Sequence, residues 1–126
     1  MTLVDLLNQA LQIRGITSAA VVSGEGFIVE GVSKDDMDLS FVGGLIASGL
    51  ASSRVLAGLM GEGEVSQTMI EYENGPVLLT PLKIGVQAAG DDDFVAVVTL
   101  DNTQNLGRAR FQLRKLLPQI AEAAKN

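Results

Sequence analysis

The chain has 126 residues, a net charge of −6 and 47% apolar residues, but no cysteine and no histidine. The missing residue types exclude disulfides, thiolate nucleophiles, Ser-His-Asp triads and nearly all zinc chemistry. The acidic balance argues against a nucleic-acid backbone or an anionic membrane surface as the partner. The length predicts one domain, residues 1–126. Because the N-terminus carries an acid and no basic region, it does not resemble a signal peptide, and a cytoplasmic protein is expected.

The first part of the chain predicts a helix followed by a hairpin. Thr2 is placed to cap the helix, Asp5 occupies the third helical position as in a capping box, and Gly15 is placed to end it. Two β-rich runs then flank the turn Gly24-Glu25-Gly26, which indicates a hairpin. The predicted strands are residues 16–23 and 27–32.

Residues 37–61 form the stretch on which the rest of the chain depends, because a helix built from them has no polar side. The stretch carries only two charges, Asp38 and Arg54. A helix that is apolar all round must be covered all round. The uncharged run, residues 39–53, is shorter than the roughly 20 residues that a membrane span needs. The pattern therefore favours an interface with a second copy or a partner, with the helix capped from Ser33, Asp35 and Asp36.

One side of this helix is small, which lets another backbone approach closely. The small residues are Ser40, Gly43, Gly44, Ala47, Ala51 and Gly58. The other two sides are built from larger apolar residues, namely Leu39, Val42, Ile46, Leu50 and Met60 on one and Phe41, Leu45, Val55 and Leu59 on the other.

Three strands are predicted after the central helix. The first, residues 64–73, has a polar centre, and Asn74-Gly75 behind it is the strongest hairpin signal in the chain. Pro81 in the second, residues 76–84, indicates a strand end or a bulge. The third, residues 94–100, is the most apolar and is expected in the centre of the sheet.

A last helix is predicted from about Gln104. Its cap is expected at Asp101, Asn102 or Thr103, and Pro118 should kink the helix or end its first part. The apolar positions follow helical spacing, at Leu106, Ala109, Leu113, Leu116, Leu117 and Ile120. Four basic residues fall on the outer side, namely Arg108, Arg110, Arg114 and Lys115.

This order of elements predicts an α+β fold with three layers. Hairpins dominate, so the five-stranded sheet should be mostly antiparallel. The central helix is expected on one face, and the N- and C-terminal helices on the other.

The sequence resembles the roadblock family, small regulatory proteins related to the roadblock-type dynein light chains. The resemblance rests on GITSAAVVSGEGFIVEGV, GPVLLTPL, FVAVVTLDNTQNLG and NLGRARFQLRKLL, at these places in this order. It covers essentially the whole chain.

The resemblance implies a homodimer whose central helices pack antiparallel and whose third strands pair edge to edge into one ten-stranded sheet. The dimer-interface residues would be Ser40, Gly43, Gly44, Ala47, Ala51, Ser66, Thr68, Ile70 and Tyr72. The resemblance also implies a Ras-like small GTPase as partner, since bacterial and archaeal members commonly work with such proteins. The candidate contacts with the GTPase are Asp38, Phe41, Leu45, Ser52 and Arg54.

Other motifs favour structural explanations. Gly24-Glu25-Gly26 resembles part of a phosphate loop, but a strand follows it and Val29 stands at the place of a third glycine, so a hairpin turn is favoured. The acids at 91–93 and the pair Glu62 and Glu64 are interpreted as solvated turns rather than as a cation site or a catalytic pair. The arginines of the last helix are interpreted mostly as a solvated face. No cofactor, metal or catalytic residue is predicted.

Arg54 leaves three explanations open, because it lies mid-helix among apolar residues: a pair with an acid of the other copy, a contact with a partner, or a side chain extended to water. The function is predicted as a non-catalytic homodimeric regulator of a Ras-like GTPase. The alternative is a structural dimerisation or scaffold module of a larger assembly. A small-ligand sensor is a third possibility, for which no convergent polar cluster is present.

Overall fold

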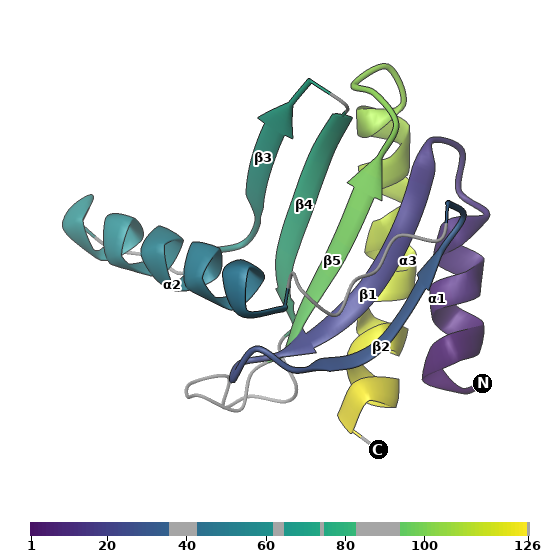
Figure 1. Ribbon diagram of the computed structural model, residues 1–126, viewed down its shortest axis with the longest axis horizontal. Helices are drawn as coiled ribbons and strands as arrows, with labels where there is room; N and C mark the ends of the chain where they lie inside the picture. Colours follow the sequence, from purple (N-terminus) through teal and green to yellow (C-terminus); the bar gives the residue numbers. More distant parts are fainter. Residues whose placement is uncertain (36–42, 62–64, 74, 83–93, 126) are drawn as a thin grey trace.

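The computed structural model describes residues 1–35, 43–61, 65–73, 75–82 and 94–125. Within these ranges, three helices and five strands follow one another in the predicted order, which confirms the α+β fold (Figure 1). The helices are α1 (Leu3–Leu11), α2 (Gly43–Leu59) and α3 (Leu106–Lys125). The strands are β1 (Ile16–Ser23), β2 (Ile28–Ser33), β3 (Thr68–Tyr72), β4 (Gly75–Leu82) and β5 (Phe94–Leu100).

The five strands form one sheet in the order β2-β1-β5-β4-β3, and each neighbouring pair is antiparallel. The apolar strand β5 lies in the centre, as its composition predicts. The two edges are β2 and β3. Because side chains alternate between the faces of a strand, each inner strand supplies apolar residues to both faces of the sheet.

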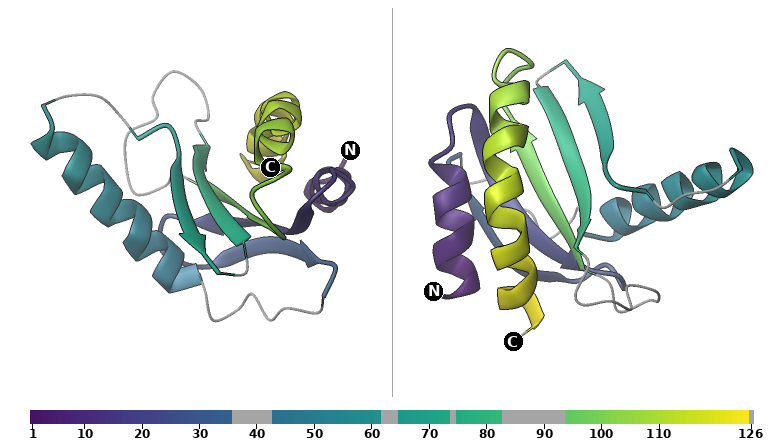
Figure 2. Two further views of the ribbon diagram at one scale, coloured as in Figure 1. Left: turned by 90° about the horizontal axis from the view of Figure 1, so that it is seen from above. Right: turned by 180° about the vertical axis from the view of Figure 1, so that it is seen from behind.

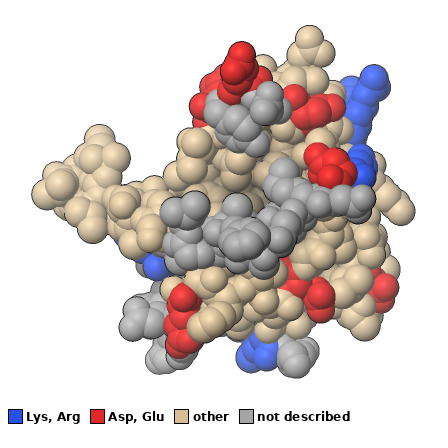
Figure 3. Space-filling model, in the orientation of Figure 1, with Lys and Arg blue, Asp and Glu red and all other residues tan. Residues whose placement is uncertain are grey.

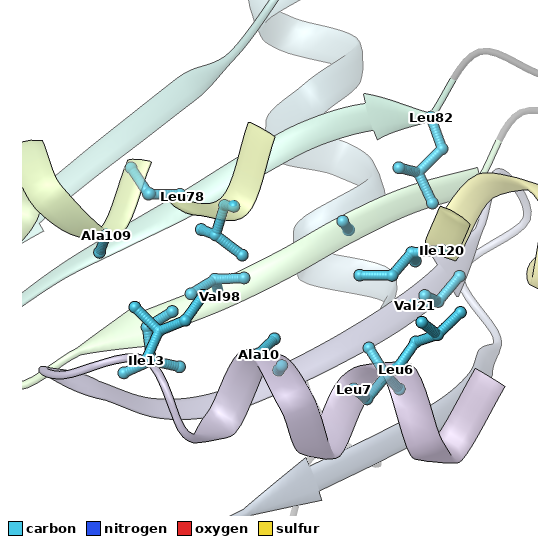
Figure 4. Close-up of a cluster of buried hydrophobic side chains, with 14 of the residues drawn as sticks. Leu6, Leu7, Ala10, Ile13, Val21, Leu78, Leu82, Val98, Ala109 and Ile120 are labelled. Atoms are coloured by element: carbon cyan, nitrogen blue, oxygen red, sulfur yellow. The ribbon is translucent and has the colours of Figure 1, made fainter. Parts of the chain in front are cut away.

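One face of the sheet is covered by α1 and α3, which lie side by side (Figure 2). Their apolar sides point into the larger hydrophobic cluster, where side chains from both helices meet those of the inner strands (Figure 4). Leu7, Val21, Leu78 and Ile120 are almost completely buried in it. This layer has the packing expected of two amphipathic helices on a sheet.

The opposite face carries α2 and a smaller cluster (Figure 2). Its buried residues are Ala20, Val22, Leu50, Leu79, Val95 and Val97. Ser18 and Thr99 are also buried, and their side-chain oxygens lie 2.5 Å apart in a hydrogen bond across the β1–β5 pair. The central helix is therefore on its predicted face.

The start of α1 is a capping box, as predicted. The Asp5 N–H donates to Thr2 Oγ1 at 3.2 Å, and the Thr2 N–H donates to Asp5 Oδ2 at 3.1 Å. The hydrogen bonds from Thr2 lower the pKa of the Asp5 carboxyl. The helix ends at Leu11, however, four residues before the predicted stop at Gly15. Its last turn tightens, with the Gln12 and Ile13 N–H groups bonded three residues back, and this brings Ile13 into the core.

The first hairpin confirms the turn at residues 24–26. Gly26 has a φ of +96°, and the Ser23 N–H donates to the Phe27 carbonyl at 2.7 Å. The second strand is shifted by one residue relative to the prediction and begins at Ile28. A register irregularity between Val21 and Val22 accompanies this shift.

The β3–β4 hairpin is confirmed, but its turn lies one residue earlier than predicted. Tyr72 pairs with Gly75, so Gly75 is already the first residue of β4. The strand β3 begins at Thr68 and is shorter than the predicted residues 64–73. Pro81 pairs with Val95 without a register shift, at a place where β4 has no neighbour on the β3 side. It therefore marks a strand end rather than a bulge.

The last helix begins at Leu106, two residues later than predicted. The Gln104 N–H donates to Asn102 Oδ1 at 2.8 Å, and this local turn precedes the helix. Pro118 does not end the helix, which continues to Lys125. The proline lies on the exposed side, while Leu113 and Ile120 on either side of it hold α3 against the sheet.

Gly75 is the glycine whose replacement we expect to be most harmful. Its φ is +125°, and a Cβ there would overlap the carbonyl oxygen of Leu100. Gly75→Ala should lower the free energy of unfolding by about 2 kcal/mol or more, from combined strain and overlap. Gly107→Ala is the matched control, because nothing lies within 4 Å of its added Cβ. Because alanine favours a helix, Gly107→Ala should raise the stability by up to about 1 kcal/mol. Chemical denaturation measures both, and equal effects would contradict this account of Gly75.

Candidate protein–protein interface

The second half of α2 extends away from the sheet (Figure 1). Among the described side chains of α2, those of Ile46 and Leu50 pack in the smaller cluster. The helix runs for 17 residues, or about 25 Å, and beyond that contact it keeps its apolar composition. The large side chains exposed there are Val55 at 65%, Leu56 at 58%, Leu59 at 80% and Met60 at 79%.

The stripe of α2 that faces the sheet is narrow. Ile46, Leu50, Ser53 and Ala57 are its less exposed positions, spaced by three or four residues as one side of a helix requires. The Ser53 hydroxyl donates to the Gly49 carbonyl at 2.9 Å, so this polar group is satisfied within the helix. Ser48, residues 51–52 and residues 54–56 are exposed, so from Ala51 onward most of the circumference of α2 is uncovered.

The edge strand β3 lies on the same side of the molecule as α2 (Figures 1 and 2). Ile70 is 48% exposed, and it pairs with Val77, which packs against the smaller cluster. Directly paired residues share a face of the sheet, so Ile70 faces the α2 side. Because β3 is an edge, its outer backbone groups have no strand beside them.

The projecting end of α2 and Ile70 of β3 present apolar side chains on the same side of the molecule (Figure 1). In the space-filling view, the projecting end of α2 shows no acidic or basic side chain (Figure 3). An exposed apolar patch on this scale marks an interaction site in a folded protein. We call it the α2 surface, and its described large residues are Val55, Leu56, Leu59, Met60 and Ile70.

The structure describes the predicted dimer-interface residues to different extents. Ala51 is exposed on α2, Thr68 is half-buried at the start of β3, and Ile70 is exposed within β3. Ser66 is exposed but precedes β3 by two residues. The backbones of Gly43, Gly44, Ala47 and Tyr72 belong to α2 and β3, and Ser40 lies outside the described residues.

The predicted GTPase contacts are placed only in part. Ser52 and Arg54 are exposed on α2, and Arg54 also has an interaction within the chain. The backbone of Leu45 belongs to the first turn of α2, and Asp38 and Phe41 lie outside the described residues.

Sequence reasoning missed the four large residues at the end of α2. It assigned the interface to the small side of the helix, placed Val55, Leu59 and Met60 on the two larger apolar sides, and did not place Leu56 on any side. A signal was present, because residues 55–60 are as apolar as the part that the sheet covers. Their position beyond the sheet is set by the angle at which α2 crosses it, which periodicity does not contain.

The other motifs form no chemical site in the described residues. The turn 24–26 leads into β2, so it lacks the helix that a phosphate loop needs. No group of three His, Cys, Asp or Glu residues that could hold a metal occurs in the described ranges. Glu62, Glu64 and the acids at 91–93 lie outside them. In the same ranges, none of the helices combines the length and apolar character of a membrane crossing.

An antiparallel sheet with α1 and α3 on one face and the partly uncovered helix α2 on the other defines a small α+β domain. The sequence pattern of the Roadblock/LC7 domain matches residues 2–88, more than half of the chain. The chain therefore belongs to the Roadblock/LC7 domain family.

The chain is also similar to other sequences and to solved structures. Two uncharacterized proteins of Methanocaldococcus jannaschii are each 26% identical over 106 residues, covering 84% of this chain and 85% of their own. The structure of MglB from Myxococcus xanthus has a TM-score of 0.79 at 20% identity, covering 95% of this chain and 92% of that one. An MglB structure with a tetrameric arrangement has a TM-score of 0.78 at 22% identity, covering 97% and 89%. At these identities the structures establish the shared fold.

Proposed function

We propose that this protein is a non-catalytic homodimer that binds and regulates a Ras-like small GTPase. The observation that carries the proposal is the uncovered apolar half of α2, in a chain that belongs to the Roadblock/LC7 family. A helix exposed in this way would promote aggregation of an isolated chain, so we expect another protein surface to bury it.

A second copy fits the α2 surface better than an unrelated partner does. The small stripe that includes Ala51 and Gly58 lets a second α2 approach closely, and nothing lies within 4 Å of a Cβ at Gly58. The edge strand β3 beside it supplies backbone groups for a two-fold strand pair. Burial of each large side chain is worth about 1.5–3 kcal/mol, so four such residues per copy support a stable dimer.

The GTPase would bind across the two α2 helices, on the parts that dimerisation leaves exposed. This part of the proposal rests on the family resemblance and on the exposure of Ser52 and Arg54. Asp38, Phe41 and Leu45 remain candidate contacts on the same helix stretch. A cytoplasmic location fits a partner of this kind.

A non-catalytic role fits the residues that the chain can offer. The sequence has no His and no Cys, and Arg54 is the only basic residue of α2. An arginine that enters the site of another protein usually comes from a loop, and a mid-helix side chain has less reach. Regulation would then act by favouring one arrangement of the switch loops of the GTPase.

The alternative proposal is a dimerisation module within a larger assembly. The α2 surface supports it equally well, since any structural dimer needs the same cover. The presence or absence of a bound GTPase separates the two. The sensor hypothesis gains no support from the described residues, which include no convergent polar cluster besides the hydroxyl groups near Thr99.

The first prediction of this proposal concerns the mass of the protein in solution. Light scattering after size exclusion should give about twice 13.2 kDa. The double substitution Val55→Glu and Leu59→Glu should dissociate the dimer, because it would place two charges in the apolar interface between the two α2 helices. Phe27→Glu is the control: Phe27 is 67% exposed in the turn that precedes β2, which is the sheet edge opposite β3, and its substitution should leave the dimer intact. A monomeric parent protein at micromolar concentration would refute the dimer.

The second prediction compares the two edges of the sheet. If β3 pairs with its twin, the amides of Thr68–Tyr72 should all be protected from hydrogen exchange in the dimer. Every second amide of β2, Ile28–Ser33, should exchange quickly, because that edge stays open and serves as the internal control. Alternating fast exchange in β3 of an intact dimer would exclude the strand pairing while leaving the helix contact possible.

The third prediction concerns Arg54 and requires the GTPase partner, identified by copurification. Arg54→Ala should weaken binding modestly and leave the hydrolysis rate at saturation within about tenfold, or roughly 1.4 kcal/mol. Ser52→Ala is the comparison at the other exposed candidate contact of α2, which lies on a different side of the helix and carries no charge. A loss near a thousandfold at saturating protein, with the dimer intact, would make Arg54 catalytic.

A further inference from the structure

The outer side of α3 carries a concentrated positive charge in an acidic protein. Arg108, Arg110, Arg114 and Lys115 are all exposed on its first half. Residues 1–15 and 106–125, which supply α1 and α3, contain six basic residues against two acids. The remainder of the chain contains three basic residues against thirteen acids. The molecule is therefore strongly polarised, with net charges of +4 and −10 on the two parts.

An exposed aromatic ring lies within this group of cations. Phe111 is 61% exposed, and Lys115 Nζ lies 5.2 Å from the centre of its ring. Arg108 and Arg114 are three residues before and after it, so three cations flank the ring on one side of the helix. We call these five residues, Arg108, Arg110, Phe111, Arg114 and Lys115, the α3 surface.

Stability of the helix does not explain the α3 surface. Arg108 lies in the first turn, where the helix dipole disfavours a positive charge. Arg110 and Arg114 are four residues apart, a spacing that sets like charges side by side. No Asp or Glu occupies a position three or four residues from any of the four cations. Within the described ranges, none of these four side chains forms an ion pair with a carboxylate.

We propose that the α3 surface binds a short acidic segment of a partner protein, with an apolar side chain of that segment seated on Phe111. Guanidinium groups match carboxylates in a two-point hydrogen-bonded geometry, and three of the four cations are arginines. The charged length, from Arg108 to Lys115, spans about 10 Å of helix, which suits two turns of a helical segment or a few extended residues.

The surroundings of the α3 surface favour a short segment over a longer anion. Exposed acids stand near both ends, with Asp101 before the helix and Glu122 after the cations. A nucleic acid or an anionic membrane would extend past this short positive stretch and meet the acids. Phe111 is also the only large apolar side chain of α3 that is exposed, which is too little for insertion into a membrane.

This binding site is independent of the proposed dimer and GTPase functions. It lies on the face of the sheet opposite α2 (Figure 2), so both surfaces can be occupied at once. A partner bound here would connect the protein to a second molecule without covering the α2 surface.

The test uses a panel of fluorescent synthetic peptides made of aspartate and glutamate with one internal leucine. The position of the leucine differs from peptide to peptide. Fluorescence anisotropy should show binding to the full chain at low salt that weakens as salt is raised. Arg108→Gln with Arg114→Gln should weaken binding about tenfold, since two charge-assisted contacts are lost. Lys34→Gln with Lys125→Gln removes the same charge outside the surface and should change the affinity less than about twofold.

Phe111→Ala separates apolar seating from charge attraction. It should lower the affinity for the leucine peptide by about fivefold. The affinity for a peptide with alanine in place of leucine should stay almost unchanged. The Val55→Glu and Leu59→Glu variant should bind the peptides normally, so a failed dimer and a failed α3 site give different results.

Three results would overturn the proposal. One is the absence of measurable binding by every peptide of the panel at low salt. Another is an equal loss of affinity in the Lys34 and Lys125 control. The last is tighter binding of a DNA oligonucleotide, or of vesicles containing phosphatidylserine, than of the peptides.

Discussion

The whole structure depends on a mismatch between α2 and the sheet. The helix is apolar around its full circumference, but the sheet offers it only the small surface formed by Ala20, Val22, Leu79, Val95 and Val97. The hydrophobic effect scales with the apolar area removed from water, so most of the stabilisation that α2 can give is not realised in the single chain. The dimer proposed above would recover it. The stability of the fold and the assembly of the protein are then two aspects of one interaction.

The opposite layer has no such mismatch. The apolar residues of α1 and α3 are confined to one side of each helix, and Leu7, Leu113 and Ile120 bury that side against the sheet. Their polar sides remain in water. This layer therefore covers its face of β1, β5 and β4 without leaving a large apolar side uncovered.

Much of the fold could be predicted from the sequence because its patterns are local. The capping box of Thr2 and Asp5, the glycine turn after β1 and the apolar run of β5 each specify their own element. The wrong predictions concerned the first and last residues of helices and strands. The early end of α1 follows from Ile13 turning into the core, and the late start of α3 follows from a local turn at Asn102. Tertiary packing decides such boundaries, and no short window of sequence records it.

The candidate site was less predictable, for a geometric reason. Helical spacing correctly put Ile46 and Leu50 on one side, and both contact the sheet. The same spacing assigned Met60 to that side, yet it is 79% exposed because the helix has already left the sheet. Periodicity fixes the direction of a side chain around the helix axis and says nothing about what lies opposite it.

Charge and apolar surface are separated in this protein, and the separation constrains what it can bind. The residues that define the α2 surface are apolar, so this surface selects a partner by shape complementarity and by the exclusion of water. A second copy of the same helix is well suited to both. The α3 surface presents four cations around a single ring, so it selects by charge and loses affinity as salt rises. Because the sheet stands between them, occupation of one surface need not strain the other. Under the two proposals, the protein would keep a permanent partner on one face and exchange a second on the other, as a regulatory scaffold would.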